Sequence, residues 1–378
     1  MDDDGKDEIV EFGPRRPLLR SPWLLIVAVL AVVVVGLRLH QRDPTSAPQP
    51  SPAITLPAPA VQSAAVPPVV AGPPRTTQVG RLLGITGDWD LFALGADEVV
   101  RIQPGLGRVT RTPFPGLRSN AVAFVPVRGG VIVRPWDVVT GYLVSDGSPA
   151  RPLAAALSEG GAVFPGPDDD HVWMQRSPAA NRSLVLVRPD GTPAGATIRP
   201  TSTYWPATGD GSGYMILTGI DGAYLARPDG ARKITSGSVL AAGPTGWLVV
   251  ECDKWARCVR VVIDRATGGR RSLPSSPSFV DAQTGTVAPD GSMASYIPVT
   301  AARPVVHLLD LYTGADRALT VDLGTDGYGT RLVWSPDGRW LFLAAGGRLL
   351  AVDPRTGAAQ ELGGDLPAIL QVAVRARR

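Results

Sequence analysis

The stretch Trp334–Gly357, WSPDGRWLFLAAGGRLLAVDPRTG, contains the plan on which most of this chain is built. A Ser-Pro-Asp-Gly turn is followed by an apolar run, a short Gly turn, a second apolar run and an Asp-x-x-x-Gly turn. Gly supplies the positive φ that such turns need, Pro fixes φ at the position before, and Asp bonds its own backbone. Short apolar runs bounded by turns are typical of buried strands. The stretch therefore predicts successive antiparallel strands joined by tight turns.

The same two turns recur toward the N-terminus at a spacing of about 40 residues. The first turn recurs at Ala288–Gly291 and, in weaker forms, at Ala242–Gly246, Gly209–Gly213, Pro165–Asp168 and Val127–Gly130, and the later turn recurs at Asp310–Gly314 and Asp264–Gly268. Each unit is interpreted as a four-stranded antiparallel sheet, and such units at this spacing are the signature of a β-propeller. Seven units can be counted over residues 79–378. We therefore expect an all-β, seven-bladed propeller, with six or eight blades as alternatives because the first unit is weak.

One apolar run, Ala368–Val374, is left over after the last unit. It is expected to complete the first blade, because a strand from the C-terminus there would remove the free edge of an open sheet.

The strand–Ser-Pro-Asp-Gly–strand pattern followed by Asp-x-x-Thr-Gly resembles the WD-repeat-like propeller repeat of TolB-type proteins, most closely over residues 284–362. Trp89-Asp90 and Trp136-Asp137 do not make this a true WD-repeat chain, since neither ends a third strand. The resemblance implies a membrane-anchored bacterial envelope protein of actinobacterial type, whose propeller acts mostly as a binding or interaction platform.

Residues 23–37 are uninterrupted apolar and lie between Arg20 and Arg38. This run, extended to residues 21–38, predicts a transmembrane helix, with Arg20 reaching to the headgroups. A cleaved signal is the alternative, but no small-x-small site closely follows the apolar core, which favours a retained signal-anchor. The predicted organisation is an acidic cytoplasmic tail (1–20), a transmembrane helix (21–38), a disordered Pro/Ala-rich stalk (39–78) and the propeller (79–378).

Cys252 and Cys258 are the only two cysteines, and β-rich runs flank the loop between them. They can face each other across a hairpin, which predicts a disulfide. A disulfide implies an oxidising compartment. Together with the arginines before the apolar run, this predicts a single-pass protein with its N-terminus in the cytoplasm and its propeller outside.

The sequence offers little catalytic chemistry. Its three histidines are far apart, no metal-ligand spacing is present, and no cofactor is expected. The net charge of +3 comes without a basic stripe, so no nucleic-acid partner is expected. Aromatic side chains near the blade turns are candidate ligand contacts at the channel mouth, with packing between blades as the alternative; these are Trp89, Trp136, Trp173 and Trp205.

The sequence thus predicts a binding or protein-interaction platform of the cell envelope rather than an enzyme. Its partners are expected to be the lipid bilayer, through residues 21–38, and an envelope protein or glycan. Two alternatives stay open: an envelope hydrolase or lyase with its site at the channel mouth, and a solute-sensing ectodomain that signals through the N-terminal tail.

Overall fold

The computed structural model describes residues 9–10, 75–78, 84–113, 121–135, 141–146, 148–153, 161–175, 183–201, 203–274, 282–298, 304–321, 323, 332–363 and 365–377. The predicted tail, membrane segment (21–38) and stalk lie outside the described residues, apart from β1 (Ile9–Val10) and β2 (Arg75–Gln78). Within the described ranges, no helix has both the length and the apolar character needed to cross a bilayer.

The described strands pair into six sheets. Three of them contain the strands up to β13, and the first also contains the last strand, β30. The first sheet contains β2, β3 (Trp89–Leu94), β4 (Glu98–Gln103), β5 (Arg108–Pro113) and β30 (Gln371–Ala376), with the short 3-10 helix η1 (Pro104–Leu106) between β4 and β5. The second contains β6 (Ala121–Val127), β7 (Gly130–Pro135), β8 (Tyr142–Ser145) and β9 (Arg151–Pro152). The third contains β10 (Val163–Pro165), β11 (Val172–Gln175), β12 (Leu184–Val187) and β13 (Pro193–Ile198).

The remaining strands form three sheets. The fourth sheet contains β14 (Trp205–Gly209), β15 (Met215–Gly219), β16 (Gly222–Arg227) and β17 (Gly230–Thr235), with β1 on its outer edge. The double sheet contains β18 (Ser238–Ala242), β19 (Gly246–Cys252), β20 (Cys258–Asp264), β21 (Arg270–Ser272), β22 (Ala282–Val287), β23 (Met293–Pro298), β24 (His307–Asp310) and β25 (Asp316–Ala318). The last sheet contains β26 (Leu332–Trp334), β27 (Leu341–Ala345), β28 (Arg348–Val352) and β29 (Ala359–Glu361).

The prediction of seven separate blades is corrected by the double sheet: the described strands form five blade-sized sheets and one eight-stranded sheet. Its two antiparallel halves, β18–β21 and β22–β25, are joined by a parallel pairing of β18 with β22 at Ala241–Gly285 and Ala242–Thr286. Gly243 makes this approach feasible, because a Cβ there would lie 2.7 Å from the Val287 carbonyl oxygen. Two successive units therefore share one hydrogen-bonded sheet.

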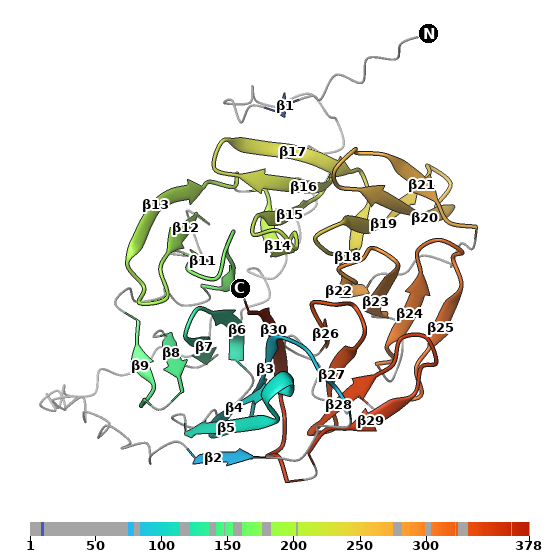
Figure 1. Ribbon diagram of the computed structural model, residues 1–378. Coiled ribbons are helices and arrows are strands. Elements are labelled where there is room, and N and C mark those ends of the chain that lie inside the picture. Colours follow the sequence, from blue (N-terminus) through green and yellow to red (C-terminus); the bar gives the residue numbers. More distant parts are fainter. Residues whose placement is uncertain are drawn as a thin grey trace, which may run out of the picture. The chain divides into compact units, whose positions relative to one another are not determined.

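The innermost strands of the sheets follow one another around a common centre, which makes the fold an all-β propeller with four-stranded antiparallel blades. Around it, β30 contacts β6, β6 contacts β10, β10 contacts β14, β22 contacts β26, and β26 returns to β30 (Figure 1). Neighbouring four-stranded groups enclose apolar clusters between their faces, such as the one around Trp173 between the third and fourth sheets. Burying such side chains supplies the main stabilisation of the fold.

An arginine on the outermost strand of each half of the double sheet bonds to a turn of the following group. Arg317 on β25 donates to the carbonyls of Pro354 (2.6 Å) and Arg355 (3.2 Å) in the last sheet. Arg271 holds the same repeat position on β21 and donates to the Tyr312 carbonyl at 3.3 Å. The repeat therefore encodes contacts between groups as well as strands and turns.

The predicted closing strand is confirmed: β30 pairs antiparallel with β3 along six residues, so the C-terminus completes the first sheet. Asp90, fully buried on β3, is at the centre of this closure. It accepts hydrogen bonds from Arg101 (2.8 Å), Arg375 (2.5 Å) and Arg377 (2.9 Å), two of which come from the C-terminal segment. Burial alone would raise the pKa of Asp90, but these bonds outweigh it and lower the pKa to about 2.

Candidate functional site

One end of the sheets, called the turn face here, carries the turns between first and second strands and between third and fourth strands. Its turns pack against one another through glycines. A Cβ on Gly213 would lie 2.1 Å from the Cα of Pro167, and a Cβ on Gly211 would lie 2.4 Å from the carbonyl carbon of Gly243. Asp337 and Asp353 accept backbone bonds within their own turns, as predicted for turn-forming residues. The motif residues of this face therefore serve packing.

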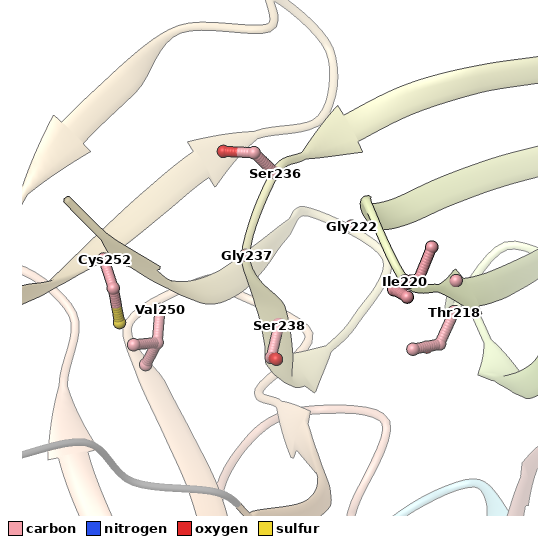
Figure 2. Close-up of a pocket in the computed structure, with 9 residues that line it drawn as sticks. Thr218, Ile220, Gly222, Ser236, Gly237, Ser238, Val250 and Cys252 are labelled. Carbon is pink, nitrogen blue, oxygen red and sulfur yellow. The ribbon is translucent and has the colours of Figure 1, made fainter. Parts of the chain in front are cut away.

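The opposite end, called the pocket face, carries a pocket of about 240 Å³ between the fourth sheet and the first half of the double sheet. The β15–β16 turn supplies one wall, the β17–β18 connection forms the middle, and the end of β19 supplies the other wall (Figure 2). The lining residues are Thr218, Gly219, Ile220, Gly222, Ser236, Gly237, Ser238, Val250 and Cys252.

Glycine accounts for this hollow. Gly222 begins β16 at φ +129°, in the region that side chains disfavour, and a Cβ there would lie 2.1 Å from the Thr235 carbonyl oxygen. A Cβ on Gly237 would lie 1.8 Å from the Val250 carbonyl oxygen. At these glycines the backbones of neighbouring strands come into direct contact, because no side chain separates them. The pocket lies beside these contacts.

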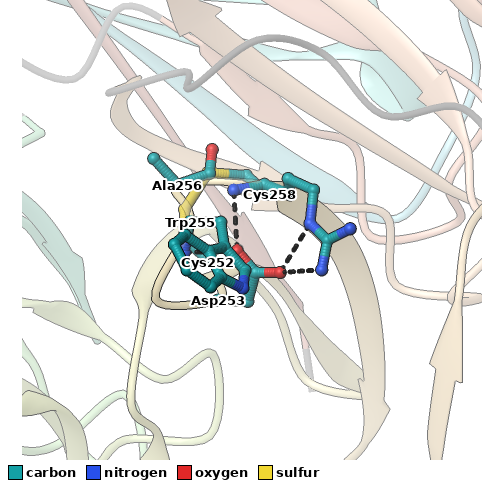
Figure 3. The surroundings of a disulfide bond; sticks show 6 residues. Cys252, Asp253, Trp255, Ala256 and Cys258 are labelled. Atoms are coloured by element: carbon teal, nitrogen blue, oxygen red, sulfur yellow. Dashed lines mark hydrogen bonds and ion pairs between the residues drawn. A yellow bond between two sulfur atoms is a disulfide. The ribbon is translucent and has the colours of Figure 1, made fainter.

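The loop beside the pocket is closed by the predicted disulfide, which the structure contains. Cys252 and Cys258 are direct cross-strand partners of β19 and β20, with their Cα atoms 3.9 Å apart (Figure 3). Within the loop, Asp253 accepts bonds from the Trp255 amide (2.8 Å) and from the Arg257 amide (3.0 Å) and side chain (2.7 Å). Hydrogen bonds to its charged form, first from Arg257, lower the pKa of Asp253. The loop thus holds Trp255 at a defined position.

Large apolar side chains are exposed on this face. Ile220 at the β15–β16 turn is 97% exposed, Trp255 in the disulfide loop is 68% exposed, and Trp205 at the start of β14 is 52% exposed. Val259, directly after the disulfide, is also exposed. Trp205 pairs with Thr218, a pocket residue, so their side chains point to the same side of the fourth sheet. Contiguous exposed apolar surface is typical of binding sites.

The predicted ligand contacts lie in different surroundings. Trp89 is buried between the first and last sheets, where its ring centroid lies 5.3 Å from that of Phe342. Trp173 is buried between the third and fourth sheets, and its indole donates to the Gly213 carbonyl at 2.7 Å. Both occupy the packing role that the sequence left open as the alternative. Trp136 lies outside the described residues, and Trp205 is exposed at the pocket face.

Sequence reasoning missed Ile220 and Trp255, although both left a signal. Ile220 occupies a two-residue hairpin turn, a place where polar residues and glycine dominate. Trp255 stands in the middle of the short loop between the two cysteines, where no core can cover it. An apolar residue in a loop too short to bury it is expected to be exposed.

Groups of the kind used in catalysis meet at a second place, between the halves of the double sheet. Asp316 bonds to Arg260 (2.8 Å), the Tyr296 hydroxyl (2.7 Å) and His307 (2.9 Å). Burial would raise the pKa of Asp316, but the bonds from His307, Tyr296 and Arg260 lower it to about 2. Burial, followed by the bond to Asp316, raises the pKa of Tyr296. These bonds join β20 to β23–β25.

No cluster of three His, Cys, Asp or Glu side chains that could hold a metal ion occurs in the part of the chain that the structure describes. No family model matches the chain, and no curated protein matches it. Comparison with solved structures finds likenesses at low identity. TolB from Acinetobacter baumannii is 14% identical over 77% of this chain and 68% of its own length, with a TM-score of 0.44.

Two further solved structures show the same level of likeness. AztD from Citrobacter koseri is 12% identical over 74% of this chain and 82% of its own, with a TM-score of 0.44. A protein from Lactobacillus plantarum is 12% identical over 76% of this chain and 99% of its own, with a TM-score of 0.49. These likenesses do not identify a function. The strand pairings described above define the fold.

Proposed function

We propose that this chain is a membrane-anchored binding module of the cell envelope, which engages its ligand through the pocket face of the propeller. One observation carries the proposal. Of the six large apolar side chains that are exposed among the described residues, four lie on this face in two neighbouring groups of strands; they are Trp205, Ile220, Trp255 and Val259. Exposed aromatic and aliphatic side chains around a pocket are the composition expected of a binding site.

Membrane anchoring is the second part of the proposal. It is supported by the apolar run at residues 23–37 and by the arginines that flank it. An extracytoplasmic propeller is supported by the Cys252–Cys258 disulfide, because disulfides persist in oxidising compartments.

The proposal assigns the protein no catalysis. The ionisable groups around Asp316 are bonded to one another between two packed strand systems, where a linking role accounts for them.

A pull-down from envelope extract tests the binding face directly. The full chain in mild detergent is compared with a variant carrying Ile220→Ser and Trp255→Ala. The control carries Leu106→Ser and Tyr312→Ala, which remove side chains of comparable exposure from the turn face; Tyr312, like Trp255, is 68% exposed. We expect the first variant to lose its captured ligand and the control to retain it. Equal capture by both variants would refute the proposed face.

The pairing of β1 with β17 gives a separate test of the membrane topology. Val10 pairs with Ala231 in the structure, whereas the proposed topology places the two residues on opposite sides of a bilayer and so requires this pairing to be absent in the membrane-inserted protein. The Val10→Cys, Ala231→Cys double variant is therefore expected to form no new disulfide in intact cells. A crosslink between these positions would place both on one side and overturn the proposed topology.

A further inference from the structure

The lining of the pocket is polar but carries no charge. Thr218, Ser236 and Ser238 contribute three hydroxyls, and the glycines contribute backbone. None of the nine lining residues is Lys, Arg, His, Asp or Glu. Hydroxyls donate and accept hydrogen bonds equally well, so they suit a partner with the same dual capacity. A charged ligand would lose its hydration without meeting a counter-charge in the pocket.

The carboxylates nearest to the lining residues in sequence are already engaged. Asp221, in the turn after Ile220, accepts the Tyr224 hydroxyl at 2.7 Å. Glu251, one residue before Cys252, accepts bonds from Thr235 and Arg270, each at 2.5 Å. The ion pair with Arg270 compensates the charge of Glu251, which favours a neutral ligand.

Two exposed tryptophans belong to the strand and the loop next to pocket-lining residues. Trp205 lies beside Thr218 on the neighbouring strand, and Trp255 lies in the loop that Cys252 begins. Both rings are exposed. A sugar ring carries hydroxyls around its edge and C–H groups on its faces, so it can bond to serine and threonine while an aromatic face covers it. The pocket, at about 240 Å³, is smaller than the 300 Å³ or more typical of drug-sized ligands. It therefore has room for one ring of a longer chain.

We propose that the pocket binds a neutral sugar residue of an envelope glycan, held by the hydroxyls of Thr218, Ser236 and Ser238 and flanked by Trp205 and Trp255. This inference rests on the proposed function, since it names the ligand class of the same face. In this proposal the disulfide positions the binding residues. It fixes Cys252 at the end of β19, which lines the pocket and begins the loop that contains Trp255.

The test is a titration of the full chain in detergent with three soluble probes: maltotriose, tri-N-acetylchitotriose and the anionic trigalacturonate. Binding is followed by tryptophan fluorescence and by calorimetry. We expect at least one neutral trisaccharide to bind and trigalacturonate not to bind. Ser238→Ala should weaken binding roughly three- to tenfold, the loss expected for one hydrogen bond. Trp255→Ala should weaken it at least as much, while Tyr312→Ala on the turn face should change nothing.

Failure of this inference and failure of the proposed function give different results. If neither neutral sugar binds, or only the anionic one does, while envelope capture still depends on Ile220 and Trp255, the glycan inference falls and a protein partner takes its place. If Ser238→Ala binds the sugar as tightly as the unchanged chain, the pocket is not the site. If the Ile220 and Trp255 variant also retains envelope capture, the proposed function falls as well.

Discussion

Replacing Asp90 with asparagine should lower the free energy of unfolding, because Asp90 holds the C-terminal strand β30 to the first sheet. Asp90 is fully buried and bonded to Arg101, Arg375 and Arg377. Asp90→Asn keeps the size of the side chain but leaves these guanidinium groups without their shared counter-charge. Breaking a buried ion pair from one side costs about 3–5 kcal/mol. The depressed pKa of about 2, against a usual 3.8, corresponds to on the order of 2 kcal/mol. We therefore expect a loss of about 3 kcal/mol.

The pH dependence follows from the direction of this pKa shift. A carboxyl whose pKa is lower in the folded state stabilises the fold above its unfolded pKa and loses that contribution as the pH falls through the folded pKa. The stabilisation from Asp90 should be complete above about pH 5 and fade between about pH 4 and 2. Asp90→Asn should therefore differ most from the unchanged chain at neutral pH and least near pH 2.

Urea unfolding of the full chain, followed by tryptophan fluorescence at several pH values, measures both effects. Asp146→Asn is the matched control, because Asp146 also bonds to Arg101 but is part-exposed at the surface, where such pairs contribute less than about 1 kcal/mol. Hydrogen exchange of β30 amides should rise in Asp90→Asn. A loss below about 1 kcal/mol for Asp90→Asn, or a loss of the same size at pH 7 and pH 2, would refute the account of the closure.

Three further outcomes are expected. Arg317→Ala should lower the free energy of unfolding by about 2 kcal/mol, because it removes two charge-assisted bonds to the next sheet; urea unfolding measures this, and an unchanged midpoint would contradict it. Gly211→Ala should lower the melting temperature more than Gly84→Ala: both have positive φ, but only at Gly211 would the Cβ meet backbone. Finally, Cys252 and Cys258 should resist maleimide labelling until a reductant is added, since they are paired in the native protein; labelling of the unreduced, folded chain would contradict this.

The sequence predicted those parts of the fold that local chemistry encodes. The two apolar runs within Trp334–Gly357 form β27 and β28, and the surplus apolar run at the C-terminus forms most of β30. Turn residues such as Asp353 were readable because their hydrogen bonds reach only two or three residues along the chain.

The features that sequence reasoning missed depend on which residues meet in space. The joining of β18 to β22 needs a close approach at Gly243, and the two strands are separated in the chain by three others, so no local pattern predicts it. The candidate tryptophans Trp173 and Trp205 could not be ranked, because a tryptophan near a turn can be either buried or exposed. Only the position of the neighbouring sheet decides that one is enclosed and the other exposed.

The pairing of β3 with β30 has a consequence for synthesis of the chain. β3, β4 and β5 leave the ribosome long before β30, which begins at Gln371. At 5–20 residues per second, this interval lasts roughly 13 to 50 seconds. Throughout it, the apolar edge of β3 has no partner and is open to pairing with another nascent chain or to capture by a chaperone. A product that lacks β30 would keep this edge of β3 unpaired.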